Sequence, residues 1–187
     1  MGLEIERKFL LKNSQILDFL KEAGVVFKHL EISQFYTKIT QNEEIRFRSE
    51  EDKFIKTIKV GKDLIREENE EFCEKAEFKK ALKNRIGHVI TKDRYIFRLN
   101  NNPCNIDVFK DNLNGLCTFE IEFADENEAL YFKLPSFLEQ FCKADVTCDK
   151  RYKNKFLAIH ANENEQIDYK RAYNVFKNKE ISPNFAA

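Results

Sequence analysis

The sequence is poor in the residues that interrupt chains, crosslink them or bind zinc. It has five glycines, three prolines and no tryptophan in 187 residues, and no Gly- or Pro-rich stretch marks a linker inside the chain. Its five cysteines are scattered and never form a Cys-x-x-Cys pair, which argues against a disulfide framework and a zinc site. Its three histidines lack the spacing of a metal-binding motif such as His-Glu-x-x-His. We therefore expect one domain with reduced thiols.

Net charge and long apolar runs are also missing. Lysine plus arginine and aspartate plus glutamate number 32 each, so a large basic footprint for duplex nucleic acid is not expected. No apolar run is long enough to span a membrane. The opening MGLEIERKFLL has charges inside its apolar stretch and no cleavage site of small residues, unlike a signal peptide. We expect a cytoplasmic protein, either a monomer or a homodimer, that binds neither membranes nor duplex nucleic acid.

Alternation of apolar and charged residues dominates the chain and predicts eight strands. They are expected at residues 3–11, 31–40, 43–49, 53–60, 65–72, 89–99, 104–110 and 117–123. Helical patterns are expected near 13–24, 73–84, 125–134 and 149–161. Strands joined by short connections suit an up-and-down barrel, because closure removes exposed strand edges.

Each predicted strand carries one ionic face, because side chains alternate sides along a strand. In the first strand, Glu4, Glu6 and Lys8 share one face, while Ile5 and Phe9 lie on the other. The same count on the other strands groups Gln34, Tyr36 and Lys38; Glu44, Arg46 and Arg48; Lys53, Ile55, Thr57 and Lys59; Arg66, Glu68 and Glu70; Lys92, Arg94, Ile96 and Arg98; and Glu120 with Glu122.

Two interpretations of this alternation are open. In an ordinary sheet the ionic face lies in water and the apolar face packs on helices. Alternatively, the sheet closes with its ionic face inward. The predicted helices are few and short and cannot cover a much larger open sheet, which favours this second interpretation. Acidic pairs two residues apart recur on three strands and basic pairs on two. We predict an α+β fold, an eight-stranded antiparallel closed β-barrel that forms a tunnel with a polar interior and peripheral helices.

Such an interior has the chemistry of a polyphosphate site. Carboxylates two residues apart on a strand are separated by about 6–7 Å, close enough to share a hard divalent cation directly or through its waters. Mg²⁺ prefers oxygen ligands and keeps waters and substrate phosphates in its shell, so a few carboxylates suffice. Arginines facing the same space bind phosphate oxygens in bidentate fashion, and lysines act as point charges.

Short motifs on the predicted strands follow one another in order. The first is Glu4-Ile5-Glu6-Arg7-Lys8. The series continues through Gln34-Phe35-Tyr36, Ile45-Arg46-Phe47-Arg48, Thr57-Ile58-Lys59, Arg66-x-Glu68-x-Glu70, Lys92-x-Arg94-Tyr95, Asp107-Val108-Phe109, Glu120-Ile121-Glu122-Phe123 and the run VTCDKRYKN at 146–154. Together they resemble the CYTH superfamily, the triphosphate tunnel metalloenzymes, whose ExExK signature is similar to the opening motif. ExExK alone is a weak pattern, but the ordered series covers about residues 3–158.

The resemblance implies an eight-stranded tunnel that binds a triphosphate together with Mg²⁺ or Mn²⁺. The implied metal ligands are Glu4, Glu6, Glu120 and Glu122. The implied contacts to the triphosphate come from Lys8, Arg46, Arg48, Lys59, Arg66 and Arg94. Positions linked to activity in compact bacterial triphosphatases match Lys92 and Tyr36, while Glu68 and Glu70 would bind a second metal ion or orient the attacking water.

Family resemblance leaves the activity partly open. The superfamily includes inorganic, thiamine and RNA triphosphatases and adenylyl cyclases. This chain most resembles the compact bacterial triphosphatases and carries no added nucleotide-specific domain, so we expect hydrolysis of inorganic tripolyphosphate. The alternatives are a cyclase, a thiamine or nucleoside triphosphatase, and a non-catalytic polyphosphate-binding module. A binding module could dispense with the acidic pairs, so their presence favours an enzyme.

Some positions keep more than one interpretation. We expect a tunnel domain at 1–161 and a tail at 162–187 that is helical and packs on the barrel. Asp107 suits either a buried salt-bridge partner or a role in the tunnel. The acidic run at 67–71 depends on register, because a shift by one residue would exchange its two inward carboxylates for their neighbours.

Overall fold

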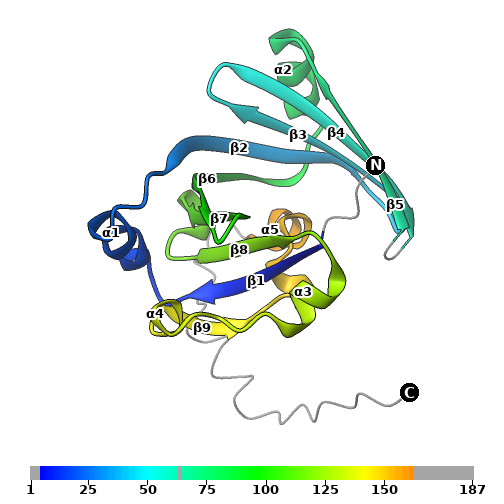
Figure 1. The fold of residues 1–187 in the computed structure, drawn as a ribbon. Helices are drawn as coiled ribbons and strands as arrows, with labels where there is room; N and C mark the ends of the chain where they lie inside the picture. Colours follow the sequence, from blue (N-terminus) through cyan, green and yellow to red (C-terminus); the bar gives the residue numbers. More distant parts are fainter. Residues whose placement is uncertain (1–4, 63–64, 162–187) are drawn as a thin grey trace.

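The computed structural model describes residues 5–62 and 65–161, which form a curved antiparallel sheet with helices around it (Figure 1). The eight predicted strands are present as β1 (Ile5–Leu11), β2 (Lys28–Ile39), β3 (Glu43–Glu50), β4 (Lys53–Lys62), β5 (Ile65–Phe72), β6 (Ile86–Leu99), β7 (Asn102–Phe109) and β8 (Cys117–Phe123). The helices are α1 (Gln15–Glu22), α2 (Lys75–Lys83), α3 (Glu126–Tyr131), α4 (Ser136–Glu139) and α5 (Asn154–His160), with 3-10 turns η1 (Asp111–Leu113) and η2 (Lys150–Tyr152). The α+β class is confirmed. Within the described ranges, no helix is long and apolar enough to cross a membrane. The predicted tail at 162–187 lies outside the described residues.

A ninth strand, β9 (Cys142–Asp145), lies at one end of the sheet beside β1. The strand order is β5-β4-β3-β2-β6-β7-β8-β1-β9. Closure into the predicted eight-stranded barrel would require β5 to pair with β1, but β9 pairs with that edge of β1. The predicted strand count is therefore wrong, and the closed barrel is not confirmed among the described residues. The sheet is still strongly curved, and Figure 1 shows β3, β4 and β5 on one side of it and β7, β8 and β1 on the other.

A β-bulge in β2 changes one of the predicted faces. Tyr36 pairs with Arg46, but the register then shifts and Lys38 pairs with Ile45. Ile45 packs on the convex side of the sheet, in the cluster under α2. Lys38 therefore leaves the ionic face that alternation assigns to it and forms an ion pair of 2.5 Å with Glu43. An extra residue in one strand reverses the alternation beyond it, which a period of two cannot anticipate.

Apolar clusters cover the convex side of the sheet. From α1, Ile16 and Leu20 pack against Phe119 and its neighbours on β1, β6, β7 and β8. From α2, Phe78 packs edge-on against Phe35 of β2, with ring centroids 5.1 Å apart. Each of these buried side chains contributes about 1.5–3 kcal/mol relative to exposure. Because the apolar positions are used on this side, the ionic positions of the same strands face the concave side.

Helix α5 packs on the concave side and not on the convex side. Its Leu157 and Ala158 are buried against Tyr36 and Ile90. Gly87 of β6 allows this approach: its φ is +67°, and a Cβ there would lie 2.2 Å from the carbonyl oxygen of Ala158. The helix thus forms an apolar floor at one end of the concave face. Ionic side chains line the rest of that face.

Candidate active site

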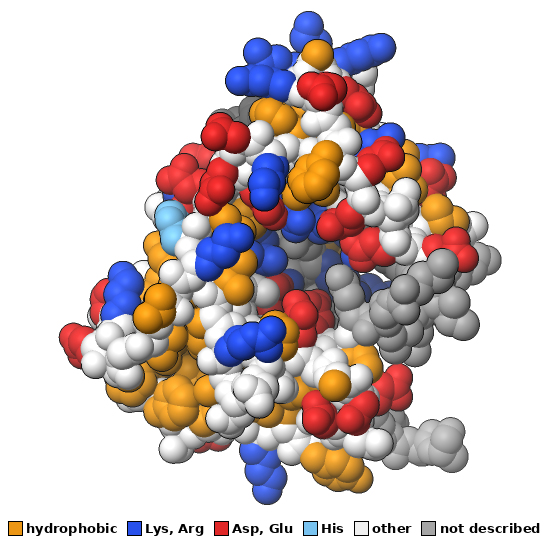
Figure 2. All heavy atoms as spheres, turned by 45° about the horizontal axis from the view of Figure 1, so that its top comes forward, with side chains coloured by type: hydrophobic (Ala, Val, Ile, Leu, Met, Phe, Trp, Pro, Cys, Tyr) orange, Lys and Arg blue, Asp and Glu red, His pale blue; other side chains and the backbone are white. Residues whose placement is uncertain are grey.

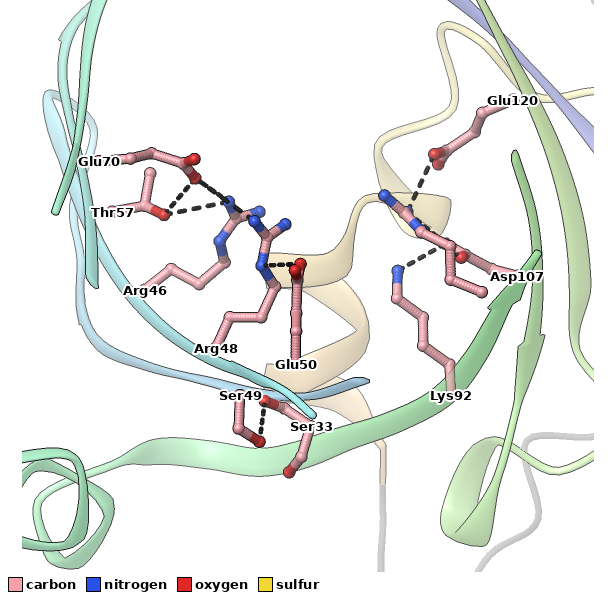
Figure 3. Close-up of polar contacts among 11 residues, drawn as sticks. Ser33, Arg46, Arg48, Ser49, Glu50, Thr57, Glu70, Lys92, Asp107 and Glu120 are labelled. Atoms are coloured by element: carbon pink, nitrogen blue, oxygen red, sulfur yellow. Dashed lines mark hydrogen bonds and ion pairs between the residues drawn. The ribbon is translucent and has the colours of Figure 1, made fainter. Parts of the chain in front are cut away.

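A hollow opens between the two halves of the curved sheet, and side chains of both charges gather around it (Figure 2). We call β6, β7, β8 and β1 the ion-pair wall and β3, β4 and β5 the arginine wall. Arg46 and Arg48 extend from the arginine wall into the space that Lys92 enters from the ion-pair wall (Figure 3). The hollow therefore collects cations from two strands, β3 and β6, that are separated in the sheet by β2.

On the ion-pair wall, cations and carboxylates alternate in a continuous chain. Lys92 Nζ lies 2.5 Å from Asp107 Oδ2, and Arg94 donates to both oxygens of Asp107, from Nε and Nη2, at 2.6 Å each. Arg94 Nη2 also lies 3.3 Å from Glu120 Oε2, and Glu120 Oε1 lies 2.6 Å from Lys8 Nζ. Strand register produces this order, because Arg94 is opposite Asp107 and Lys8 is opposite Glu120.

Burial and these neighbours shift the pKa values along the chain. Burial lowers the pKa of Lys92 to about 8, with Arg94 acting in the same direction and Asp107 opposing it. Burial alone would raise the pKa of Asp107, but Lys92 and Arg94 outweigh it and hold that pKa well below its usual range. Burial lowers the pKa of Lys8, but Glu120, together with Glu6 and Asp107, outweighs burial, so that pKa is raised. Of these groups, Lys92 is the one whose charge changes nearest to neutral pH.

On the arginine wall, two guanidinium groups share one carboxylate. Glu70 Oε1 lies 3.2 Å from Arg46 Nη2 and 3.8 Å from Arg48 Nη2. It accepts a hydrogen bond of 2.8 Å from Thr57 Oγ1, which itself accepts one of 3.2 Å from Arg46 Nη2. Burial raises the pKa of Glu70, but the Thr57 hydroxyl and the two arginines outweigh it, so the pKa is lowered. The carboxylate therefore stays ionised at neutral pH.

Positive charge converges between the two walls. Burial lowers the pKa of Arg48, Arg46 beside it lowers the pKa further, and Arg94 of the opposite wall acts in the same direction. Nε of Arg46 is buried and has no hydrogen-bond partner among the described residues. Cations held close together in a partly buried space are stabilised by an anion that binds several of them. The arrangement suits an anion with oxygens spread along its length.

The acidic strand β5 has the predicted register. Glu68 lies opposite Lys59, and their charged atoms are 2.7 Å apart. Glu71 instead binds Lys56 of the convex side at 2.9 Å. Glu68 and Glu70 therefore face the hollow, as the alternation predicts.

Tyr36 lies at the floor of the hollow, opposite Arg46. It packs with Ile90 and Leu157. Burial raises the pKa of Tyr36 to about 12, against the opposing effect of Arg46. Its hydroxyl group is therefore protonated at neutral pH and can donate a hydrogen bond, but it cannot act as a base there.

The predicted metal ligands lie on neighbouring strands of the ion-pair wall. Glu6 is opposite Glu122, and Glu120 is two residues away on the same face, while Glu4 lies outside the described residues. In the described part of the chain, no group of three or more His, Cys, Asp or Glu side chains is placed to hold a metal ion. Glu120 is instead bound by Lys8. The donors themselves, all carboxylates, fit a hard divalent cation such as Mg²⁺ or Mn²⁺.

Sequence reasoning assigned no definite role to two residues of this site, Thr57 and Asp107. Thr57 was grouped on an ionic face without a role, yet it is fully buried between charged partners. Asp107 was open between a buried salt-bridge partner and a role in the tunnel, and the structure shows it as a buried ion-pair partner of Lys92 and Arg94. The available signal was their position opposite Arg46 and Arg94 on faces that are otherwise charged. Predicted Arg66 belongs to β5, but its side chain lies outside the described residues.

Comparison with known proteins agrees with this geometry. The family model of the CYTH domain matches residues 2–147. This chain belongs to the CYTH family. The inorganic triphosphatase of Nitrosomonas europaea is 32% identical to this CYTH chain over 126 residues, which are 67% of the chain and 81% of that protein.

Solved structures share the fold of this CYTH chain. The structure of the inorganic triphosphatase NE1496 matches with a TM-score of 0.62 and 29% identity, covering 85% of this chain and 96% of the other. HpAC1 from Hippeastrum, described as a candidate adenylyl cyclase with a dominant triphosphatase activity, matches with a TM-score of 0.58 and 15% identity, covering 73% and 87% of the two chains. At that identity the second match shows the fold alone.

Proposed function

We propose that this chain hydrolyses a triphosphate, inorganic tripolyphosphate above all, in the hollow between its two walls. The observation that carries the proposal is that Arg46 and Arg48 extend from the arginine wall toward Lys92 of the opposite wall (Figure 3). The charge of Arg94, also on that opposite wall, acts on Arg48 as well. A linear triphosphate has oxygens along its whole length, so it can contact both walls at once. The match to an inorganic triphosphatase at 32% identity supports this substrate.

Basic side chains of both walls would hold the substrate. The side chains of Arg46, Arg48 and Lys59 are 16%, 16% and 22% exposed, so they remain accessible from the hollow. Lys8 and Arg94 would contact it from the ion-pair wall. Arg66 would complete the set from β5.

Carboxylates of the ion-pair wall would hold a divalent cation, Mg²⁺ or Mn²⁺. Glu6, Glu120 and Glu122, with Glu4, are the proposed ligands, and the bound cation would offset phosphoryl charge and favour attack by water. The surroundings of Glu120 keep its carboxylate ionised, as a metal ligand requires. Burial raises the pKa of Glu120, but the charge of Lys8 is the main effect that outweighs it, leaving the carboxylate ionised.

The remaining residues would position the attacking water and accept the proton that it releases. Glu68 and Glu70 would orient the attacking water, and Nζ of Lys92, with a pKa of about 8, would take up its proton. Tyr36 would donate a hydrogen bond from the floor. Phosphoryl transfer needs little covalent assistance, so positioning and charge stabilisation supply most of the acceleration.

Single changes on the arginine wall test where the substrate binds. Arg46→Ala and Arg48→Ala should each raise KM roughly 10- to 150-fold, because each removes a charged hydrogen bond of about 1.5–3 kcal/mol. Melting temperatures should stay near wild type, since neither side chain belongs to an apolar cluster. Steady-state kinetics with tripolyphosphate, with differential scanning fluorimetry alongside, measure both.

Arg98→Ala is the matched control. Arg98 lies on the same side of β6 as Arg94 but donates to the carbonyl oxygen of Asn101 in the turn that follows. Its KM should be unchanged. A normal KM in both arginine-wall variants would remove that wall from the binding site.

A further inference from the structure

Two hydrogen-bond donors and one further cation on the arginine wall surround a single carboxylate oxygen. Oε1 of Glu70 lies 2.8 Å from Thr57 Oγ1, 3.2 Å from Arg46 Nη2 and 3.8 Å from Arg48 Nη2 (Figure 3). A single oxygen facing two guanidinium groups and one hydroxyl has the surroundings of a bound phosphoryl oxygen. The carboxylate thus occupies a position with the chemistry of a phosphate subsite.

The side chains of Thr57, Arg46 and Arg48 are more buried than the side chain of Glu70. Thr57 is fully buried, and its hydroxyl contacts Arg46 of β3 on one side and Glu70 of β5 on the other. The side chains of Arg46 and Arg48 are 16% exposed, whereas that of Glu70 is 43% exposed. Glu70 also stands on β5, the last strand in the sheet order. The carboxylate can therefore leave without unpacking the donors.

Competition favours an incoming triphosphate over this carboxylate. Ion pairs to an exposed carboxylate contribute only about 0–1 kcal/mol. A triphosphate carries several charges and contacts both walls, so it gains more from the same donors than one carboxylate does. The hydroxyl of Thr57 keeps its acceptor contact from Arg46 and can turn its own hydrogen from Glu70 to the phosphoryl oxygen.

We propose that Glu70 substitutes for the substrate in the free protein: its carboxylate fills a phosphoryl-oxygen subsite formed by Thr57, Arg46 and Arg48, and the triphosphate displaces it. This inference rests on the proposed function and adds Thr57 to the groups that bind substrate. Displacement also releases the Glu70 carboxylate into the hollow only when a triphosphate is present.

Calorimetric titration of metal-free protein with tripolyphosphate, in EDTA, tests the displacement. Glu70→Gln keeps the side-chain shape and removes the competing charge, so it should bind tripolyphosphate about tenfold more tightly than wild type. Glu71→Gln makes the same change in net charge on the convex side, where Glu71 binds Lys56, and should alter the dissociation constant less than about twofold. Unchanged or weaker binding by Glu70→Gln, or equal tightening in both variants, would overturn the proposal.

The role of Thr57 has its own pair of variants. Thr57→Val keeps the shape and loses the hydroxyl, so its dissociation constant for tripolyphosphate should rise about tenfold. Thr57→Ser restores the hydroxyl and should restore most of the affinity, which a purely structural role would not require. Wild-type affinity in Thr57→Val would remove Thr57 from the subsite.

Measurements on the wild-type protein distinguish a failure of the displacement proposal from a failure of the proposed function. If it binds and hydrolyses tripolyphosphate while Glu70→Gln binds no more tightly, the displacement is wrong and the proposed function stands. If wild type neither binds tripolyphosphate nor releases phosphate from it, the proposed function itself fails.

Discussion

Asp107→Asn should lower the free energy of unfolding by about 3–5 kcal/mol, because it leaves buried cations without their shared carboxylate. Asp107 and Lys92 each have side chains that are 1% exposed and lie 2.5 Å apart. Arg94 loses its bidentate partner in the same variant. Asparagine has the same size as aspartate, so the loss reports charge and not a cavity. Urea denaturation of both proteins measures the difference.

Asp145→Asn is the control for this prediction. Asp145 pairs with Arg7, with side chains that are 40% and 23% exposed, so its replacement should cost less than about 1 kcal/mol. The effect of Asp107 should also depend on pH. The folded protein holds the pKa of Asp107 below its unfolded value of about 3.9, so the stabilisation is present above that pH and is lost as pH falls through the folded pKa. Equal losses in both variants at pH 7 would contradict a special role for Asp107.

Lys92→Arg should lower kcat about 10²- to 10⁴-fold while changing KM far less, if Nζ of Lys92 accepts a proton during hydrolysis. Its pKa of about 8 leaves the amine neutral above that pH. The wild-type kcat should therefore rise with pH through about 8. Arginine stays charged throughout this range, so the rise should disappear in the variant. Rate profiles between pH 6 and 10 measure both effects.

Two further variants help to distinguish a chemical role of Lys92 from a role in binding. Lys92→Met keeps a similar length without charge or proton exchange, and it should also lose most of kcat if it remains folded by melting temperature. Tyr36→Phe removes only a hydroxyl group and should lower kcat by a smaller factor. A Lys92→Arg protein with normal kcat and a raised KM would make Lys92 a binding residue and leave water activation to the carboxylates.

Strands and their ionic faces were predictable because the pattern is local. Glu6 and Lys8, or Arg46 and Arg48, are two residues apart on strands whose alternate positions are mostly apolar, so they must share a side. Antiparallel register then brings Lys8 opposite Glu120, a complementary charge, and Glu6 opposite Glu122, a second carboxylate. The site's composition therefore follows from alternation.

Features that depend on distant parts of the chain were not predictable. The strand β9 has four residues and pairs with β1 across more than a hundred intervening residues, so no local pattern indicates that it occupies the outer edge of β1. The bulge that moves Lys38 adds one residue without a sequence signal. The packing of α5 on the concave face depends on space at Gly87. Similarly, the lowered pKa of Lys92 arises from complete burial, which alternation alone does not give.

The most direct measurement offers tripolyphosphate, ATP and thiamine triphosphate in parallel, with Mg²⁺, with Mn²⁺ and with EDTA, and identifies the products. We predict rapid release of orthophosphate from tripolyphosphate that requires a divalent cation, with little product from the other two substrates. Tripolyphosphate that binds but is not cleaved would make the chain a polyphosphate-binding module. Cyclic AMP formed from ATP would make it a cyclase, and either result would contradict hydrolysis of an inorganic triphosphate as its activity.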